Sequence, residues 1–428
     1  MELRFLGGAG EIGRSAVLVD ETLLLDFGLM SGDPLQFPRD PPAVEAVIAS
    51  HGHLDHVGTI PALMAGEEWP RIHWTPPTAA LADRLARDTL KLHGVPETGA
   101  GQSPGQPRAY GGTYNCPFTG THVARTTQQS RTHSYGEPFD VGGYEVTFYD
   151  AGHIPGSAHV LIDDGTTKLL YTGDFHTVDQ RLVAGSTDRP AADVIITEST
   201  YADRTHEDRQ SVERRFVRAI EQTIWEGGTV VVPAFAIGRT QEVLLICAAQ
   251  DIPCYVDGMG AEITDRLLDH PTFLADAAAL RRARGHARFV DAGDGTRRQI
   301  AEEPAAIVTT AGMLTGGPAM TYVPAVRSNP TNLIAFTGFQ VPDTPGRELL
   351  ETGSAEIDGR RMRISARIEQ FDFSAHADRE GLDRFLNEYA REKVVVVHGE
   401  RTDQYATELR STGIDAVAVK NGDRITID

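Results

Sequence analysis

Several short apolar segments of this 428-residue chain end in a histidine or an aspartate beside a glycine, and this pattern constrains the fold most. The densest case is the run HGHLDH at residues 51–56, which directly follows the apolar segment Val44–Ala49. Three further segments end in the same way, namely Tyr144–Tyr149 before His153, Leu169–Tyr171 before Asp174, and Val394–Val397 before His398. We read each segment as a buried strand that carries a polar side chain at its end.

The run at residues 51–56 has the composition of a metal site. Alternate residues of an extended chain point to the same side, so His51 and His53 can share one metal ion. Asp55 and His56 follow as the chain turns, and they face a neighbouring position. Imidazole and carboxylate ligands at this density suit zinc. One cluster cannot complete two metal shells, so the other strand ends are expected to supply the remaining ligands.

The predicted secondary structure changes in character twice along the chain. The sequence up to about residue 200 is rich in strands, whereas residues 201–345 alternate strands and helices as a parallel α/β unit does. A further strand is predicted at Arg361–Ile368. Near the end of the sequence, Ala416–Val419 and Arg424–Ile427 form a closing pair of strands. We expect a surface loop over Gly94–Gly120. The prediction is a β-rich domain, residues 1–200 and 346–428, interrupted by an α/β domain at residues 201–345.

The charge balance limits the classes of function. Acidic residues number 60 and basic residues 40, which gives a net charge of −20 and argues against a protein that coats DNA electrostatically. Only four of the basic residues are lysines, at positions 91, 168, 393 and 420. An acid-rich, lysine-poor chain resembles the proteins of extreme halophiles.

The cysteine content and the length of the apolar runs indicate in which cellular compartment the protein is expected. The three cysteines, Cys116, Cys247 and Cys254, are an odd number at no metal-like spacing, so we expect a reducing cytoplasm and no disulfide framework. The longest apolar runs are far too short to cross a bilayer, and we expect no membrane association. The first residues read as a strand rather than a signal peptide.

Further motifs resemble one known family. The segments TESTY at 197–201, FSAHAD at 373–378 and VHGE at 397–400 resemble motifs A, B and C of the β-CASP nucleases, which have the metallo-β-lactamase fold. PAFAIGR at 233–239 and TAGML at 310–314 resemble the inserted domain of that family. The resemblance implies an α/β protein, an αββα sandwich with an inserted α/β β-CASP domain.

The glycine-rich opening GGAGEIGRS at 7–15 is more similar to archaeal cleavage and polyadenylation specificity factor homologues than to bacterial RNase J. No segment precedes the first strand, so we expect a member without the KH domains of the longer archaeal homologues.

The resemblance implies a role for each site residue. The first zinc ion is assigned to His51, His53 and His153, the second to Asp55, His56 and His398, and Asp174 is expected to bridge the two. Asp26 is expected to orient a ligand histidine from behind. His376 is the candidate general acid, and Glu198 is expected to keep it charged and oriented. Of the other histidines, His159 and His176 lie close to these motifs and stay ambiguous.

The inserted domain is expected to hold RNA phosphates. The candidates are Arg239, Arg347 and Ser374, together with backbone amides near Gly312 and Gly316. Arginine suits this task because its planar guanidinium can bind phosphate oxygens in pairs. For any single arginine, a solvated surface role is an equally good interpretation.

The function hypothesis is a cytoplasmic zinc-dependent ribonuclease of RNA processing or decay, including mRNA 3′-end processing. The family implies cleavage of single-stranded RNA to a 5′-phosphate and a 3′-hydroxyl, by an endonuclease, a 5′-to-3′ exonuclease or both. Homodimers or association with related nuclease subunits are compatible with it. The alternatives are a DNA-repair nuclease, an inactive RNA-binding scaffold, and a small-molecule metallo-hydrolase, which lacks the insertion and motifs A to C.

The charge balance generates the first testable prediction. If the acidic surface is an adaptation to high salt, the fold should persist or become more stable as molar KCl is added. A thermal melt followed by circular dichroism at rising KCl concentration measures this. A melting temperature that is highest at low salt would contradict the halophilic interpretation.

Overall fold

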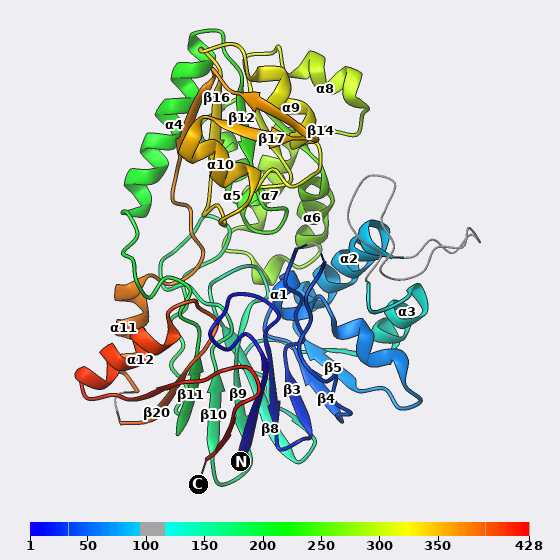
Figure 1. Cartoon of the computed structure of the whole chain (residues 1–428), viewed down its shortest axis with the longest axis vertical. Coiled ribbons are helices and arrows are strands. Elements are labelled where there is room, and N and C mark those ends of the chain that lie inside the picture. Colours follow the sequence, from blue (N-terminus) through cyan, green and yellow to red (C-terminus); the bar gives the residue numbers. More distant parts are fainter. Residues whose placement is uncertain (33, 95–115, 390, 428) are drawn as a thin grey trace. The chain divides into compact units, whose positions relative to one another are not determined.

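The computed structural model describes residues 1–32, 34–94, 116–389 and 391–427. They form two compact units (Figure 1). The first unit comprises Met1–Val178, Gly185–Thr205 and His376–Asp428, and the second comprises Asp179–Ala184 and His206–Ala375. The division at residues 200 and 345 expected from the sequence stays a prediction. Residues 95–115, most of the expected loop, lie outside the described residues.

Within the described residues, the first unit is built on two seven-stranded sheets. The first sheet has the order β22 (Arg424–Thr426), β1 (Glu2–Gly7), β2 (Ala16–Val19), β3 (Leu23–Leu25), β4 (Ala46–Ile48), β5 (Arg71–Trp74) and β6 (Ser130–Thr132). The second sheet has the order β21 (Asp415–Ala418), β20 (Lys393–Val396), β11 (Val194–Thr197), β10 (Lys168–Tyr171), β9 (Ala158–Asp163), β8 (Tyr144–Asp150) and β7 (Phe139–Val141).

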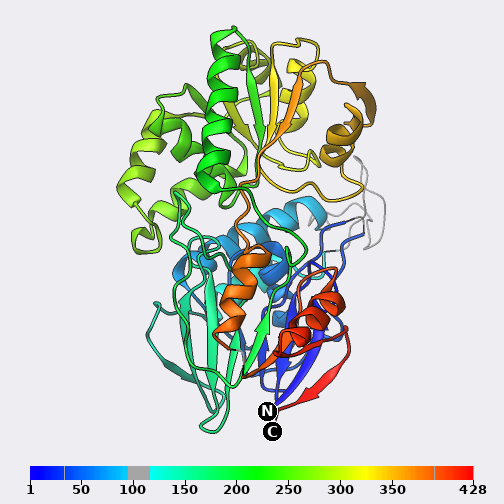
Figure 2. The ribbon, with the colours of Figure 1, turned by 90° about the vertical axis from the view of Figure 1, so that its left-hand side faces the viewer.

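Helices cover the outer face of each sheet. Those of the first sheet are α1 (Leu54–Val57), the 3-10 helix η1 (Ile60–Ala65), α2 (Pro76–His93) and α3 (Gly120–Gln129). The second sheet is covered by α11 (Arg379–Asn387) and α12 (Thr402–Ser411), the orange and red helices of Figure 2. The first unit is therefore a four-layer αββα sandwich.

The alternation of strand side chains explains these layers. In β11, Val194 and Ile196 are buried in the core between the two sheets, whereas Ile195 packs with the apolar faces of α11 and α12. Successive side chains of a strand point to opposite faces, so an entirely apolar strand needs a cover on both sides. The sequence VIIT of β11 meets that requirement here because one face packs against the other sheet and the opposite face against helices.

The two closing strands belong to different sheets, although the sequence pattern suggests a pair. Strand β21 lies parallel to β20 in the second sheet, and β22 lies antiparallel to β1 in the first. The turn between them therefore crosses from one sheet of the sandwich to the other. Short apolar strands with equal patterns carry no information about which sheet they join.

The second unit contains a six-stranded parallel sheet, as the alternating pattern predicts. Its order is β14 (Arg288–Val290), β13 (Cys254–Asp257), β15 (Ala306–Thr309), β12 (Val230–Pro233), β16 (Leu333–Phe336) and β19 (Arg367–Gln370). Val230 and Val232 face one buried cluster and Val231 faces another, so helices cover both faces of this sheet.

The helices of the second unit follow the strands in turn. They are α4 (Arg209–Trp225), α5 (Arg239–Ala249), α6 (Met259–Leu268), the 3-10 helix η2 (Pro271–Phe273), α7 (Ala277–His286), α8 (Asp294–Ile300), α9 (Ala319–Val326) and α10 (Pro345–Thr352). A hairpin of β17 (Ser354–Ile357) and β18 (Arg360–Arg363) packs beside α10.

The strand expected over Arg361–Ile368 is two strands in different sheets. Its first half falls in β18, and its second half begins β19, which pairs with β16. Ile364 and Ala366 between them are buried against the helices of this unit, which bends the chain inward. The alternating sequence RMRISARI at 361–368 fits one continuous strand and does not show this bend.

In the described part of the chain, no helix combines the length and the apolar character that a bilayer span requires.

One glycine of the first unit generates a stability prediction. A Cβ atom on Gly28 would lie 1.7 Å from the carbonyl oxygen of Asp55, so Gly28→Ala must displace the backbone of α1. We expect a loss of about 1–3 kcal/mol or more in the free energy of unfolding, measured by denaturant titration.

Gly66→Ala is the matched control, because a Cβ atom there meets its nearest neighbour, the Glu68 carbonyl oxygen, at 3.6 Å. Equal stability of the Gly28 and Gly66 variants would show that α1 adjusts without cost.

Candidate metal centre

The predicted site residues of the first unit follow strands that end at a common edge. Strands β10, β11 and β20 are parallel, and they lead directly into the segments that carry Asp174, Glu198 and His398. Strand β8, which leads to His153, is antiparallel to β9 as β10 is, so it ends at the same edge. In the other sheet, β4 leads to residues 51–56. The fold thus gathers distant parts of the sequence at the carboxyl ends of these strands.

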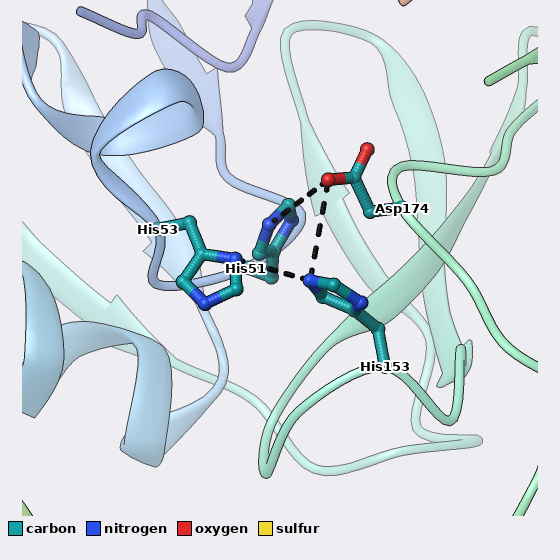
Figure 3. Close-up of side chains that lie close together, drawn as sticks. All are labelled: His51, His53, His153 and Asp174. Carbon is teal, nitrogen blue, oxygen red and sulfur yellow. Dashed lines mark hydrogen bonds and ion pairs between the residues drawn. The ribbon is translucent and has the colours of Figure 1, made fainter. Parts of the chain in front are cut away.

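Four side chains form the first ligand group, and Figure 3 shows them pointing toward one another. The Nε2 atoms of His51 and His153 lie 3.6 and 4.0 Å from Oδ2 of Asp174. His153 Nε2 also lies 3.0 Å from Nδ1 of His53. Ligand atoms at zinc distances in a tetrahedral shell are about 3.3 Å apart, and the observed distances bracket this value.

Asp55, His56, Asp174 and His398 form the second group. Oδ1 of Asp174 lies 3.3 Å from His56 Nε2 and 3.6 Å from His398 Nε2. Oδ2 of Asp55 lies 3.7 Å from the same His398 nitrogen. One oxygen of Asp174 therefore faces the first group and the other faces the second, which is the arrangement of a bridging carboxylate.

The donor atoms at this centre fit a pair of metal ions. Within the described part of the chain, four buried atoms of the two groups have no hydrogen-bond partner, namely His51 Nε2, His56 Nε2, His398 Nε2 and Asp174 Oδ1. Buried polar atoms are normally hydrogen-bonded, because leaving one unpaired costs about 1–3 kcal/mol. Orphaned atoms that converge on two points are the expected signature of sites built for cations.

Asp26 lies behind the second group, as the sequence predicts. Its buried carboxylate accepts a hydrogen bond from Nδ1 of His56 at 2.6 Å and from the hydroxyl of Tyr171 at 2.8 Å. It also accepts bonds from the backbone N–H and the hydroxyl of Ser50, both at 2.7 Å. With the proton on Nδ1, the Nε2 lone pair of His56 is directed at the ligand group.

Ser50 and Tyr171 are site residues that the sequence interpretation missed. Ser50 precedes the ligand run, and its hydroxyl lies 3.1 Å from Nδ1 of His51. Tyr171 ends the strand that leads to Asp174. The sequence signal for these two residues was their position next to the motifs. Serine and tyrosine are too common at strand ends for that position alone to identify them.

Burial and charge set the ionisation of the ligands. Burial lowers the pKa of His51 well below its usual value and that of His53 to about 4, so both imidazoles are neutral, as metal ligands must be. Burial also opposes the charge on Asp174, but His398, His56 and His376 hold the pKa of this carboxyl well below its usual value. Asp174 is therefore an anion available to two cations.

His376 and Glu198 form a pair beside the first group. Nδ1 of His376 lies 3.1 and 3.2 Å from the two oxygens of Glu198, and 3.9 Å from Oδ2 of Asp174. Glu198 is buried and also accepts a bond from the backbone N–H of Phe175. Burial works against a charged His376, but Glu198 and Asp174 raise its pKa to about 9. The imidazole is therefore protonated at neutral pH.

The predicted RNA contacts all belong to the second unit. Arg239 is buried in α5, where its guanidinium donates hydrogen bonds to the Phe373 carbonyl and the Gln180 side chain. Arg347 lies on α10 and forms an ion pair with Glu351. Ser374 donates its backbone N–H to Asp372. The contacts of Arg239 brace the unit, and the RNA-binding role of all three residues stays a prediction.

The ambiguous His159 is held away from the ligand groups. Its two ring nitrogens face the Thr172 carbonyl and the Ser186 hydroxyl, each at 2.9 Å, and the ring is buried. His159 therefore braces the strand end before Asp174.

Three family sequence models match the chain in succession. The metallo-beta-lactamase superfamily model covers residues 9–222, the Beta-Casp domain model covers 240–349, and the model of the Zn-dependent metallo-hydrolase RNA specificity domain covers 361–419. The first match includes every ligand except His398, and the third includes both His376 and His398.

Relatives match over nearly the whole chain. A protein named RNase aCSPSF2 from Saccharolobus solfataricus is 32% identical over 99% of this chain and 85% of its own length. A probable RNase, MJ4, from Methanocaldococcus jannaschii is 31% identical over the full length of both chains. The transcription termination factor FttA of Pyrococcus horikoshii is 32% identical over 99% of this chain and 70% of its own.

A solved structure has the same fold. The crystal structure of a protein of unknown function from Enterococcus faecalis V583 covers 100% of this chain and 99% of its own, with a TM-score of 0.61 and 13% identity. At this identity the similarity concerns the fold alone.

The two ligand groups generate a prediction on metal content. Elemental analysis of the purified protein should find two transition-metal ions per chain, and His53→Ala should lower that number because it removes one ligand of the first group. His270→Ala, a histidine of the second unit outside both groups, should leave it unchanged. A fully active wild-type protein without transition metal would overturn the assignment.

Proposed function

This chain belongs to the β-CASP group of the metallo-β-lactamase superfamily, and from that premise we propose that it is a metal-dependent ribonuclease acting on single-stranded RNA. The family and the αββα sandwich with an inserted α/β domain are as the sequence predicts. The observation that carries the proposal is the complete set of seven ligand side chains with the Glu198–His376 pair beside it.

RNA is favoured as the substrate by two findings. Two of the relatives are named as RNases, and residues 361–419 match a domain described by RNA specificity. The intact ligand set supports an enzyme rather than an inactive scaffold. The match to the Beta-Casp domain speaks against a small-molecule hydrolase, for which we expect no such insertion.

We assign two zinc ions to the centre. His51, His53 and His153 would hold the first, Asp55, His56 and His398 the second, and Asp174 would bridge them. Such a pair, when bound, lowers the pKa of a water molecule and neutralises charge on a phosphodiester. Neutral imidazoles and carboxylates at these distances are the ligands that zinc prefers.

The side chains divide the remaining work. Glu198 accepts a hydrogen bond from Nδ1–H of His376. The proton that His376 can give to a leaving 3′ oxygen is therefore the one on Nε2. Burial opposes the charge on His376, but the buried Glu198 carboxylate raises its pKa and so favours the protonated imidazole. The products would be a 5′-phosphate and a 3′-hydroxyl. Cleavage within the chain and 5′-to-3′ removal of nucleotides both use this chemistry.

The cellular setting follows from the same premise. The three cysteines are free thiols in the structure, which suits a reducing cytoplasm. We place the protein in RNA processing or decay, with mRNA 3′-end processing as one setting. One relative is named a transcription termination factor, which is consistent with a role close to the end of a transcript.

One experiment tests the proposal. A 5′-labelled RNA and the same RNA with an internal label are incubated with the protein, with and without zinc, beside a DNA of the same sequence. Release of a labelled mononucleotide indicates the exonuclease, and longer labelled fragments indicate the endonuclease. Cleavage of DNA alone would assign the DNA-repair alternative, and cleavage of neither would leave a scaffold.

The roles of His376 and His398 predict two different losses. His398→Ala should lose metal and activity together, because His398 belongs to the second ligand group. His376→Ala should keep both metal ions and still bind RNA, while the rate of cleavage falls about 10²–10⁴-fold.

Glu198→Gln should reduce the rate in the same direction and add little to His376→Ala, because the two side chains act as a unit. Metal analysis, RNA binding and single-turnover cleavage measure the three quantities. Loss of metal from His376→Ala would make this histidine a ligand, which its distance to Asp174 also permits.

A further inference from the structure

A serine outside every ligand motif touches two residues of the second ligand group. Ser15 ends the loop between β1 and β2, and its hydroxyl lies 2.9 Å from Nδ1 of His398. Its backbone N–H donates a hydrogen bond to the carbonyl oxygen of Asp55 at 2.8 Å. Ser15 and His398 are both buried, so water does not compete for this bond. A single residue thus connects two ligands that lie more than 300 positions apart.

The hydroxyl of Ser15 fits the tautomer that His398 needs as a metal ligand. Nε2 of His398 faces the carboxylates of Asp55 and Asp174 and has no hydrogen-bond partner in the described structure. A proton on Nε2 would therefore be a buried donor without an acceptor. A proton on Nδ1 is satisfied by the oxygen of Ser15, and it leaves the Nε2 lone pair directed at the metal position.

The loop that carries Ser15 also holds the backbone of His398. The φ angle of His398 is +46°, a left-handed conformation that is uncommon for residues other than glycine. The Gly8 carbonyl accepts the N–H of His398 at 2.7 Å, and the Glu11 carbonyl accepts the N–H of Gly399 at 3.1 Å. Side chain and backbone of this ligand are therefore fixed by the same nine-residue stretch, Gly7–Ser15.

The two histidines of the second group have unequal partners. The Nδ1 proton of His56 is bound by a buried carboxylate, Asp26, at 2.6 Å. In the described part of the chain, the partner of His398 Nδ1 is the neutral hydroxyl of Ser15. Hydrogen bonds to ionised groups are about twice as strong as those between neutral groups. The orientation of His398 therefore depends on a single, weaker bond.

We propose that Ser15 is a positioning residue of the second metal site, which sets the tautomer and orientation of His398 and holds Asp55 beside it. This inference rests on the two-metal centre of the proposed function. It requires that loss of the hydroxyl lowers the affinity of the second site for its metal ion. The affinity of the first site should stay unchanged, because no hydrogen bond links any of its ligands to Ser15 in the described structure.

The test is a titration of the metal-free protein with zinc or Co²⁺, followed by calorimetry and by the visible spectrum of bound cobalt. Ser15→Ala and Ser15→Cys should bind the first ion as the wild type does and the second about 10- to 100-fold more weakly. The cysteine variant keeps the volume of the side chain and replaces the hydroxyl by a weak acceptor, so it covers the case in which the alanine variant folds poorly.

Ser186→Ala is the matched control. Ser186 is also buried, and its hydroxyl lies at the same distance, 2.9 Å, from a histidine that belongs to neither ligand group, His159. This variant should bind both ions normally. The proposal would be overturned if the Ser15 variants bound the second ion with wild-type affinity, or if they lost affinity for both ions equally.

Failure of the two-metal centre itself is visible separately, because the wild-type protein would then bind fewer than two ions.

Discussion

The shared carboxylate of Asp174 is the constraint on which the first unit depends. Its two oxygens face two different groups of histidines, and it is almost entirely buried. An isolated buried carboxylate is costly, so cations or protonated imidazoles must accompany it. Burial and the neighbouring carboxylates pull the histidines in opposite directions, since the pKa of His51 falls while that of His56 rises. A centre of this kind is stable only when its positive charge is supplied, which couples the fold to metal binding.

The ends of buried strands and turns with left-handed backbones together position the charged side chains around Asp174. The ligands follow buried strands, but one ligand, His398 with φ +46°, and one residue that orients a ligand, Asp26 with φ +57°, have left-handed backbones. Such conformations cost about 1–3 kcal/mol each and persist only where the surroundings impose them. At both positions a short strand ends, and hydrogen bonds from neighbouring segments fix the next residue. The sandwich thus stabilises a geometry that the local sequence disfavours.

The sequence pattern drew attention to side chains that the structure brings together, because histidine and aspartate are the residue types that bind metal ions. Histidine and aspartate after an apolar strand stand out, and the structure gathers His51, His153, Asp174 and His398. The supporting residues are ordinary ones, so Ser50, Tyr171 and Ser15 give no signal until the fold brings them to a histidine nitrogen. The strand pattern predicted a β-rich domain interrupted by an α/β domain, and the resemblance to the β-CASP nucleases implied the αββα sandwich. Neither showed which sheet a short strand joins.

The antiparallel pairing of β1 with β22 has a consequence for synthesis on the ribosome. Strand β1 finds one of its two neighbours only when residues 424–426 have been made. His376 and His398 also come after the whole second unit in the chain. When the second unit has been made, a nascent chain therefore carries six of the seven ligand side chains but lacks both His376 and His398. The centre therefore reaches its full set of ligands only at residue 398, after the whole second unit has been made.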